Sequence, residues 1–220
     1  EMQRSLVGSE MCIRDRYNTY LWRKIQKKMI DTEYLKHFEE RLQQNLLHLC
    51  TTDGVLDGTL LATEDLDKRW HDLAPEYVAD AVEQIRDYPT VSVAWAAYLG
   101  LGVACHWDED WEACMQATYK SYYGEQGFDD MDEHIVHDLL GLPLDGVEAK
   151  HLESVIRRCA QYAVDAIRHE QIEPQSPRAF HVFARACRTM FRIGAAIELK
   201  RLGYKFEKVQ IRQVPGGLPA

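Results

Sequence analysis

The stretch Val91-Ser-Val-Ala-Trp-Ala-Ala-Tyr-Leu-Gly-Leu-Gly-Val-Ala-Cys105 is the longest apolar run in the chain. Its apolar residues fall on every side of a helix, which is typical of a helix that is buried inside a protein. A membrane-spanning helix needs about twenty apolar residues, and this run has about fifteen. Ala94, Ala97, Gly100 and Ala104 provide small surfaces against which other helices can pack closely. We therefore predict that this segment is the buried central helix of the fold.

Apolar residues recur with helical spacing on both sides of this run. On the N-terminal side, helices are predicted at 32–50, at 64–72 and from 75 to 87. On the C-terminal side, helices are predicted at 111–123, 128–140, 147–167 and 177–202, and Gly203 closes the last one. The sequence thus predicts an all-α fold, an irregular bundle of seven or eight helices around the buried central helix.

Length and composition indicate one globular domain. The chain has 220 residues, of which 46% are hydrophobic and 28% charged, and this suffices for one sizeable core. The segment 4–16 resembles the translation of a sequencing-library adapter, so we predict that residues 1–16 are not native. The all-α domain is then expected at 17–203, followed by a C-terminal tail at 204–220. Met29 is a candidate for the natural start.

The cysteines and the N-terminus indicate a compartment. Six cysteines stand at wide, irregular spacings, without the closely spaced framework of small secreted proteins. The N-terminus also lacks the continuous apolar region of a secretory signal. We therefore expect a cytoplasmic protein with no membrane partner.

Acidic residues and histidines are concentrated between His106 and Asp138. Positions three or four apart on a helix share a face, so a helix here brings Asp130 and His134 together with His137 or Asp138. His106, at the end of the central helix, is placed to join them. Imidazole and carboxylate groups are the usual ligands of catalytic zinc, iron and manganese. The pattern predicts a divalent metal site, and the alternative is a solvated acidic face.

The pair His137-Asp138, with His106 upstream and Asp165 downstream, resembles the His, His-Asp, Asp order of HD-domain phosphohydrolases. The resemblance implies a divalent metal held by these four residues and a metal-bound water that attacks a phosphate ester. The resemblance rests on one dipeptide and on the approximate spacing of His106 and Asp165. The sequence departs from the family because no lysine closely follows the His-Asp pair.

Aromatic residues are concentrated in the same part of the chain. Seven of them lie between residues 95 and 123: Trp95, Tyr98, Trp107, Trp111, Tyr119, Tyr122 and Tyr123. Their helical spacing is typical of core packing, and the alternative is that some of them line a small-molecule pocket near the acidic cluster. Trp107 and Trp111, at the acidic corner, are candidates for an exposed ligand or partner surface.

Basic residues form a stripe on the last predicted helix. Arg178, Arg185, Arg188 and Arg192 are spaced seven, three and four residues apart, so they lie on one face. This stripe is a second candidate surface for a ligand or partner, and the alternative is that it faces solvent or pairs with the acidic segment 108–133. A nucleic-acid partner is not expected, because the net charge is -9 and no known nucleic-acid motif is present.

Two functions are compatible with these features. The first is a non-catalytic binding or interaction protein with a protein or small-molecule partner. The second is a metal-dependent hydrolase in which Glu133 is the general base that activates a metal-bound water. Convergence of three or more of the predicted ligands favours the second function, and an exposed apolar patch favours the first.

Overall fold

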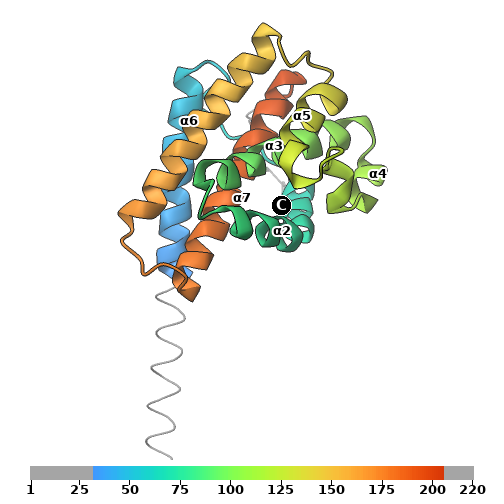
Figure 1. Cartoon of the computed structure of the whole chain (residues 1–220). Helices are drawn as coiled ribbons and strands as arrows, with labels where there is room; N and C mark the ends of the chain where they lie inside the picture. The colour runs from blue at the N-terminus through green and yellow to red at the C-terminus, as the bar shows by residue number, and fades with distance from the viewer. Residues whose placement is uncertain (1–31, 206–220) are drawn as a thin grey trace, which may run out of the picture.

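A computed structural model describes residues 32–205, which form a bundle of helices (Figure 1). A first helix at 32–52 is followed by α2 (Glu64–Gln84), α3 (Pro89–Glu109), α4 (Trp111–Gln116), η1 (Tyr119–Tyr122), η2 (Phe128–Asp130), α5 (Met131–Glu133), η3 (His134–Leu139), α6 (Val147–His169) and α7 (Pro177–Arg201). No strand is found among residues 32–205. The predicted all-α bundle is confirmed. The predicted adapter-derived segment 1–16, Met29 and the tail beyond residue 205 lie outside the described residues.

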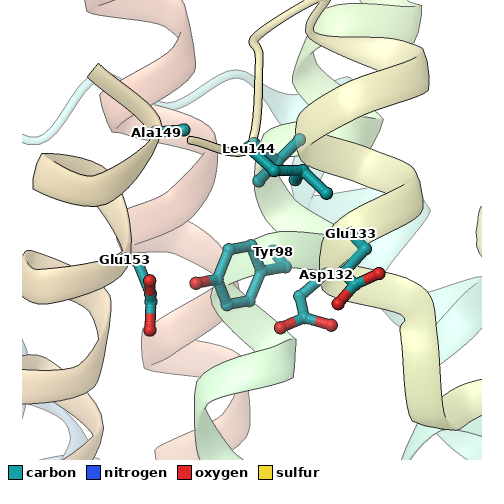
Figure 2. A pocket seen from close by; sticks show the side chains of 7 residues that line it. Tyr98, Asp132, Glu133, Leu144, Ala149 and Glu153 are labelled. Carbon is teal, nitrogen blue, oxygen red and sulfur yellow. The ribbon is translucent and has the colours of Figure 1, made fainter. Parts of the chain in front are cut away.

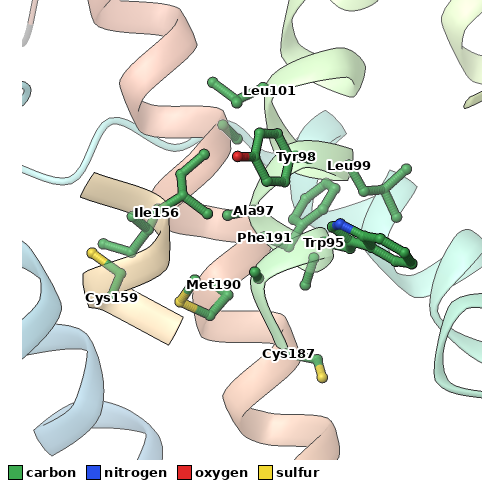
Figure 3. Close-up of a cluster of buried hydrophobic side chains, with 14 of the residues drawn as sticks. Trp95, Ala97, Tyr98, Leu99, Leu101, Ile156, Cys159, Cys187, Met190 and Phe191 are labelled. Carbon is green, nitrogen blue, oxygen red and sulfur yellow. The ribbon is translucent and has the colours of Figure 1, made fainter. Parts of the chain in front are cut away.

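Helix α3 is the centre of the bundle, as its sequence predicts. It contacts α2, α4, α5, α6, α7 and η3. Every residue from Ser92 to Cys105 is buried, which explains why the run carries apolar side chains on all sides. Figure 3 shows the core where α3 meets α6 and α7, with Trp95, Leu99 and Phe191 among its larger side chains.

Two glycines let α3 and α7 touch backbone to backbone. A Cβ atom on Gly100 would lie 2.1 Å from the carbonyl oxygen of Phe191, and one on Gly194 would lie 1.9 Å from the carbonyl oxygen of Ala97. Neither oxygen can move aside, because each belongs to the backbone of a packed helix. The crossing of these helices therefore requires glycine at both positions. The sequence pointed to Gly100, whereas Gly194 was missed.

The prediction of two separate helices, divided before Pro75, was wrong. The helix runs from Glu64 to Gln84 with Pro75 inside it. Proline removes one backbone hydrogen bond and destabilises a helix interior. One buried face nevertheless continues through it, formed by Leu66, Arg69, Trp70, Leu73, Tyr77, Val78 and Ala81. Packing of this face against the core outweighs the local cost of the proline.

Helix α4 ends seven residues earlier than predicted. The predicted helix runs to residue 123, but α4 ends at Gln116 and Ala117 is extended. The buried side chain of Arg69 donates hydrogen bonds to the carbonyls of Met115 at 3.4 Å and Ala117 at 2.6 Å. Carbonyls at a helix end need such partners. Arg69 thus stabilises the early end of α4, which no local pattern in 111–123 indicates.

The predicted helix at 128–140 is split into three short elements. It consists of the turn η2, a single turn of α-helix in α5 and the π-helix η3. The Leu140 amide donates to the Ile135 carbonyl at 2.9 Å, and the Leu142 amide donates to the Val136 carbonyl at 3.0 Å. These wide turns differ from the α-helical spacing that the prediction assumed.

The last two long helices agree closely with the sequence. The predicted helices at 147–167 and 177–202 correspond to α6 and α7. Gly203, predicted to close α7, has a φ of 94°, and the Tyr204 amide donates to the Leu199 carbonyl at 2.9 Å. Within the described part of the chain, no helix combines the length and apolar character that crossing a membrane demands.

We expect the substitution Gly100→Ala to lower the free energy of unfolding by about 3 kcal/mol, because its methyl group clashes with the α7 backbone. Gly102→Ala is the matched control on the same helix. There the new Cβ meets side-chain atoms and no backbone, namely Ile135 Cγ1 at 3.2 Å and Leu139 Cδ1 and Tyr122 Cδ1 at 3.3 Å. These can move, and alanine favours the helix, so we expect a change within about 1 kcal/mol. Urea denaturation measures both, and equal losses would contradict the role of the crossing.

Candidate functional site

A pocket of about 260 Å³ opens between α3, α5, η3 and α6 (Figure 2). Its lining residues are Tyr98, Asp132, Glu133, Val136, Leu144, Ala149 and Glu153. Tyr98 comes from α3, Asp132 and Glu133 from α5, and Glu153 from α6. Elements far apart in the sequence therefore meet around one cavity.

Tyr98 is the most deeply buried polar group of this pocket. Its side chain is only 5% exposed, and its hydroxyl makes no hydrogen bond with any other residue in the range 32–205. The hydroxyl opens into the cavity, where solvent or a ligand can form a hydrogen bond with it. Burial raises the pKa of Tyr98 above its ordinary value, and the charges of Asp132 and Glu153 raise it further. The phenol is thus neutral and available to a bound group.

Three carboxyl groups surround Tyr98. Figure 2 shows Glu153 on one side of the ring and Asp132 and Glu133 on the other. Partial burial raises the pKa of Asp132 above its ordinary value, although hydrogen bonds from the Glu133 backbone and the Trp95 side chain lower it. Glu153 accepts a hydrogen bond from Arg157 at the outer surface of α6. The pocket thus presents more negative charge than its surroundings balance.

The remaining wall is apolar and reaches the surface. Val136 and Ala149 are buried, whereas Leu144 is 44% exposed at the rim. Val147, which begins α6 three residues later, is 88% exposed. An exposed apolar rim beside a polar pocket is typical of sites that hold organic molecules.

The π-helix η3 helps to shape this wall. It is followed by Gly141, which has a φ of 67° that favours glycine. The chain then passes through 142–146 before α6 begins, which carries Leu144 to the edge of the pocket. π-Helical turns often occur at functional sites, because they displace the side chains that follow them.

The structure brings together three of the five predicted metal ligands. Asp138 lies 2.8 Å from Nδ1 of His134 and 2.6 Å from Nδ1 of His137. The hydrogen bonds with His137 and His134 hold the pKa of Asp138 below its ordinary value. His137 and Asp138 are both more than half exposed, so this cluster lies at the surface.

The other two predicted ligands lie elsewhere. Nδ1 of His106 is 3.3 Å from the Tyr122 hydroxyl. Asp130 accepts a hydrogen bond from the Gln126 amide at 2.9 Å and fits against Gly124, where a Cβ atom would clash with it. Within residues 32–205, no three side chains among His, Cys, Asp and Glu are placed to share a metal ion.

The residues of the phosphohydrolase resemblance are also spread out. Asp165 pairs with Gln161 and, at 3.3 Å, with Arg168 on the surface of α6. Glu133, the predicted general base, lines the pocket beside Tyr98. The metal site stays a prediction. It is tested by comparing the metal content of the untagged protein with that of a His134→Ala and His137→Ala double variant.

The arginine stripe of α7 pairs within the molecule. Glu39 lies 2.6 Å from Arg185 and 3.2 Å from Arg188, and Asp67 lies 3.3 Å from Arg192. The expected partners were in the segment 108–133, but the carboxylates that pair with these three arginines come from the helix 32–52 and from α2. The stripe faces those helices because they cover the same side of α7.

The two tryptophans of the acidic corner differ in exposure. Trp107 is half-buried, and its ring lies 5.9 Å from that of Tyr204, whose hydroxyl donates to Asp108 at 2.7 Å. Trp111 is 57% exposed at the start of α4. An exposed surface at this corner therefore depends on Trp111 more than on Trp107.

Two pocket residues show what the sequence could and could not reveal. Tyr98 belongs to the aromatic group for which a pocket near the acidic cluster was considered. Glu153 was missed, because it is one of many charged residues on the exposed face of an amphipathic helix. Only the docking of α6 beside α3 brings Glu153 to Tyr98.

No protein-family model matches the chain, and neither a curated protein nor a solved structure is similar to it. Function must therefore be inferred from the geometry of the molecule itself. The pocket around Tyr98 is the feature that carries such an inference furthest.

We expect Glu39→Gln to lower the free energy of unfolding by about 1–2 kcal/mol, because Glu39 is buried between two partly exposed arginines. The neighbouring Glu40→Gln is the control, since Glu40 forms only an exposed pair with Lys36 at 3.7 Å. It should change stability by less than about 0.5 kcal/mol. Chemical denaturation measures both, and equal effects would show that the stripe contributes no buried pairing.

We expect Asp132→Asn to stabilise the ligand-free protein at pH 7. Because its pKa is raised, the folded state holds the Asp132 proton more tightly than the unfolded chain does. The ionised carboxylate therefore costs stability at pH 7, and this cost disappears as the pH falls through the raised pKa toward the ordinary value. Urea denaturation across this pH range should show a gain that shrinks on acidification. Asp129→Asn, at an exposed neighbour, should show no such trend.

Proposed function

We propose that this protein is a non-catalytic binding module and that its binding site is the Tyr98 pocket. The observation that carries the proposal is the Tyr98 hydroxyl, which faces a cavity from a 5% exposed side chain and has no hydrogen-bond partner within the described residues. Because this hydroxyl opens into the cavity, a polar group of a ligand that enters can become its hydrogen-bond partner.

The composition of the lining supports binding over catalysis. The polar groups are a neutral phenol and carboxylates, and they stand beside apolar side chains. Mostly apolar walls with a few placed polar groups are usual in small-molecule sites. The described cysteines, which would be the strongest nucleophiles, do not line the pocket. Burial raises the pKa of Cys105 to about 11, so its reactive thiolate form is disfavoured at pH 7.

The second predicted function, a metal-dependent hydrolase, has less support than the binding module. Three of its five predicted ligands, His134, His137 and Asp138, lie together at the surface. His106 instead lies against Tyr122, and Asp130 accepts a hydrogen bond from Gln126. Its predicted base, Glu133, lines the pocket. These positions favour a role for the acidic segment in ligand binding.

We expect Tyr98→Phe to leave the stability of the ligand-free protein unchanged or slightly raised, because the lost hydroxyl has no partner among residues 32–205. A tyrosine that only stabilises the fold through its hydroxyl would lose stability instead. Tyr77→Phe is the control, since the Tyr77 hydroxyl donates to the Ser92 carbonyl at 2.8 Å in the core. Tyr77→Phe should destabilise by about 1 kcal/mol. Thermal and urea unfolding of both variants distinguish the two kinds of tyrosine.

Binding itself is tested with a library of small amines, carboxylic acids, sugars and neutral aromatic compounds, read by thermal shift. Molecules that raise the melting temperature of the wild type should lose this effect in Ala149→Leu, because the larger side chain fills the pocket. His151→Leu adds the same side chain at an exposed site on the same helix and should retain the effect. A library without hits, or hits that survive Ala149→Leu, would contradict the proposal.

A further inference from the structure

The charged residues that line the Tyr98 pocket all carry negative charge. Asp132, Glu133 and Glu153 are its ionisable carboxyl groups, and no lysine, arginine or histidine is among the lining residues in the described chain. Arg157 pairs with Glu153, but it is 72% exposed and stands outside the lining. A cleft with one sign of charge and apolar walls concentrates ions of the opposite sign. The ligand of this pocket should therefore be a cation.

The carboxyl groups are separated in a way that a single metal ion does not match. They come from two elements, and Figure 2 shows them on opposite sides of the Tyr98 ring. Among residues 32–205 they are not grouped closely enough to coordinate one ion. Separate negative groups at the two ends of one cavity suit a ligand with positive charges at both ends.

The space between the carboxyl groups is apolar. The Tyr98 ring, Val136, Leu144 and Ala149 form this part of the wall. A hydrated inorganic ion gains nothing from such a surface, whereas a methylene chain gains free energy by leaving water there. The ring face also attracts an ammonium group through its quadrupole.

The volume of the pocket limits the ligand further. At about 260 Å³ it lies just below the range of pockets that hold drug-sized molecules. A short aliphatic molecule fits this space, whereas a folded peptide domain does not. The exposed Leu144 at the rim allows a longer chain to extend outward.

We propose that the Tyr98 pocket binds an aliphatic diamine or polyamine. One ammonium group pairs with Glu153 and donates a hydrogen bond to the neutral Tyr98 hydroxyl. A second ammonium group pairs with Asp132 and Glu133, and the methylene chain between them lies on the apolar wall. This inference rests on the proposed binding function and names the ligand class of the same site.

The test is isothermal titration calorimetry of the full chain with 1,4-diaminobutane. The comparison molecules are n-butylamine, which has one ammonium group, 1,4-butanediol, which has none, and Mg²⁺, a cation without methylene groups. We expect saturable binding of the diamine, binding of butylamine that is about tenfold weaker or more, and no saturable binding of the diol or Mg²⁺.

Three variants locate the binding. Asp132→Asn and Glu153→Gln keep the shape of the side chains and should each weaken diamine binding by about tenfold. Arg157→Gln should strengthen it, because Glu153 loses its competing partner. Glu83→Gln, the same change at an exposed position of α2, should leave the affinity unchanged. Since Asp132→Asn is expected to stabilise the fold, a loss of binding in that variant cannot be ascribed to unfolding.

The outcomes of these experiments distinguish a wrong ligand class from a wrong binding site. Absence of diamine binding, or equal binding by Asp132→Asn, Glu153→Gln and the wild type, overturns the diamine proposal. If other library compounds still bind in a way that Ala149→Leu abolishes, the site stands and the ligand class is wrong. If no compound of any class does so, the proposed function is wrong as well.

Discussion

The backbone contact between α3 and α7 is the constraint on which the rest of the structure depends. Gly100 fits against the Phe191 carbonyl, and Gly194 fits against the Ala97 carbonyl, so each helix supplies the gap that the other fills. Once α7 lies this close to α3, the remaining helices can surround the pair. Helix α6 packs on both, α2 also contacts both, and α5 and η3 pack against α3. A methyl group at either glycine would push apart two helices that α2 and α6 both contact.

The same crossing positions the candidate site. Tyr98 follows directly after Ala97, whose carbonyl carbon and oxygen face Gly194. The main chain at Tyr98 is thus held at a rigid point in the molecule, while its hydroxyl projects into the cavity. Binding groups on rigid helices lose little freedom when a ligand arrives, which favours affinity for a small molecule. Glu153 depends on the docking of α6 against α3 and α7 in the same way.

The sequence could predict the helices that local apolar periodicity determines. The continuous apolar run predicted the central helix, and the spacing of apolar residues predicted α6 and α7 with nearly the observed bounds. It could not predict features that depend on contacts between distant segments. The early end of α4 needs Arg69 from α2, and the unbroken α2 needs the core that packs on both sides of Pro75. The pocket is of this second kind, since its acidic residues are 20 positions apart on α5 and α6, at Glu133 and Glu153.

The carboxyl groups of the pocket differ from two ion-paired buried carboxylates of the fold, Glu198 and Glu39. Glu198 is fully buried and receives two hydrogen bonds from Arg201, at 2.8 and 2.9 Å. Glu39 is paired with Arg185 and Arg188, as expected for a charge removed from water. Partial burial raises the pKa of Asp132, although hydrogen bonds from the Glu133 backbone and the Trp95 side chain lower it. Tyr98 beside it lacks a hydrogen bond within the described chain. The Tyr98 hydroxyl is therefore left for a partner from outside the described residues.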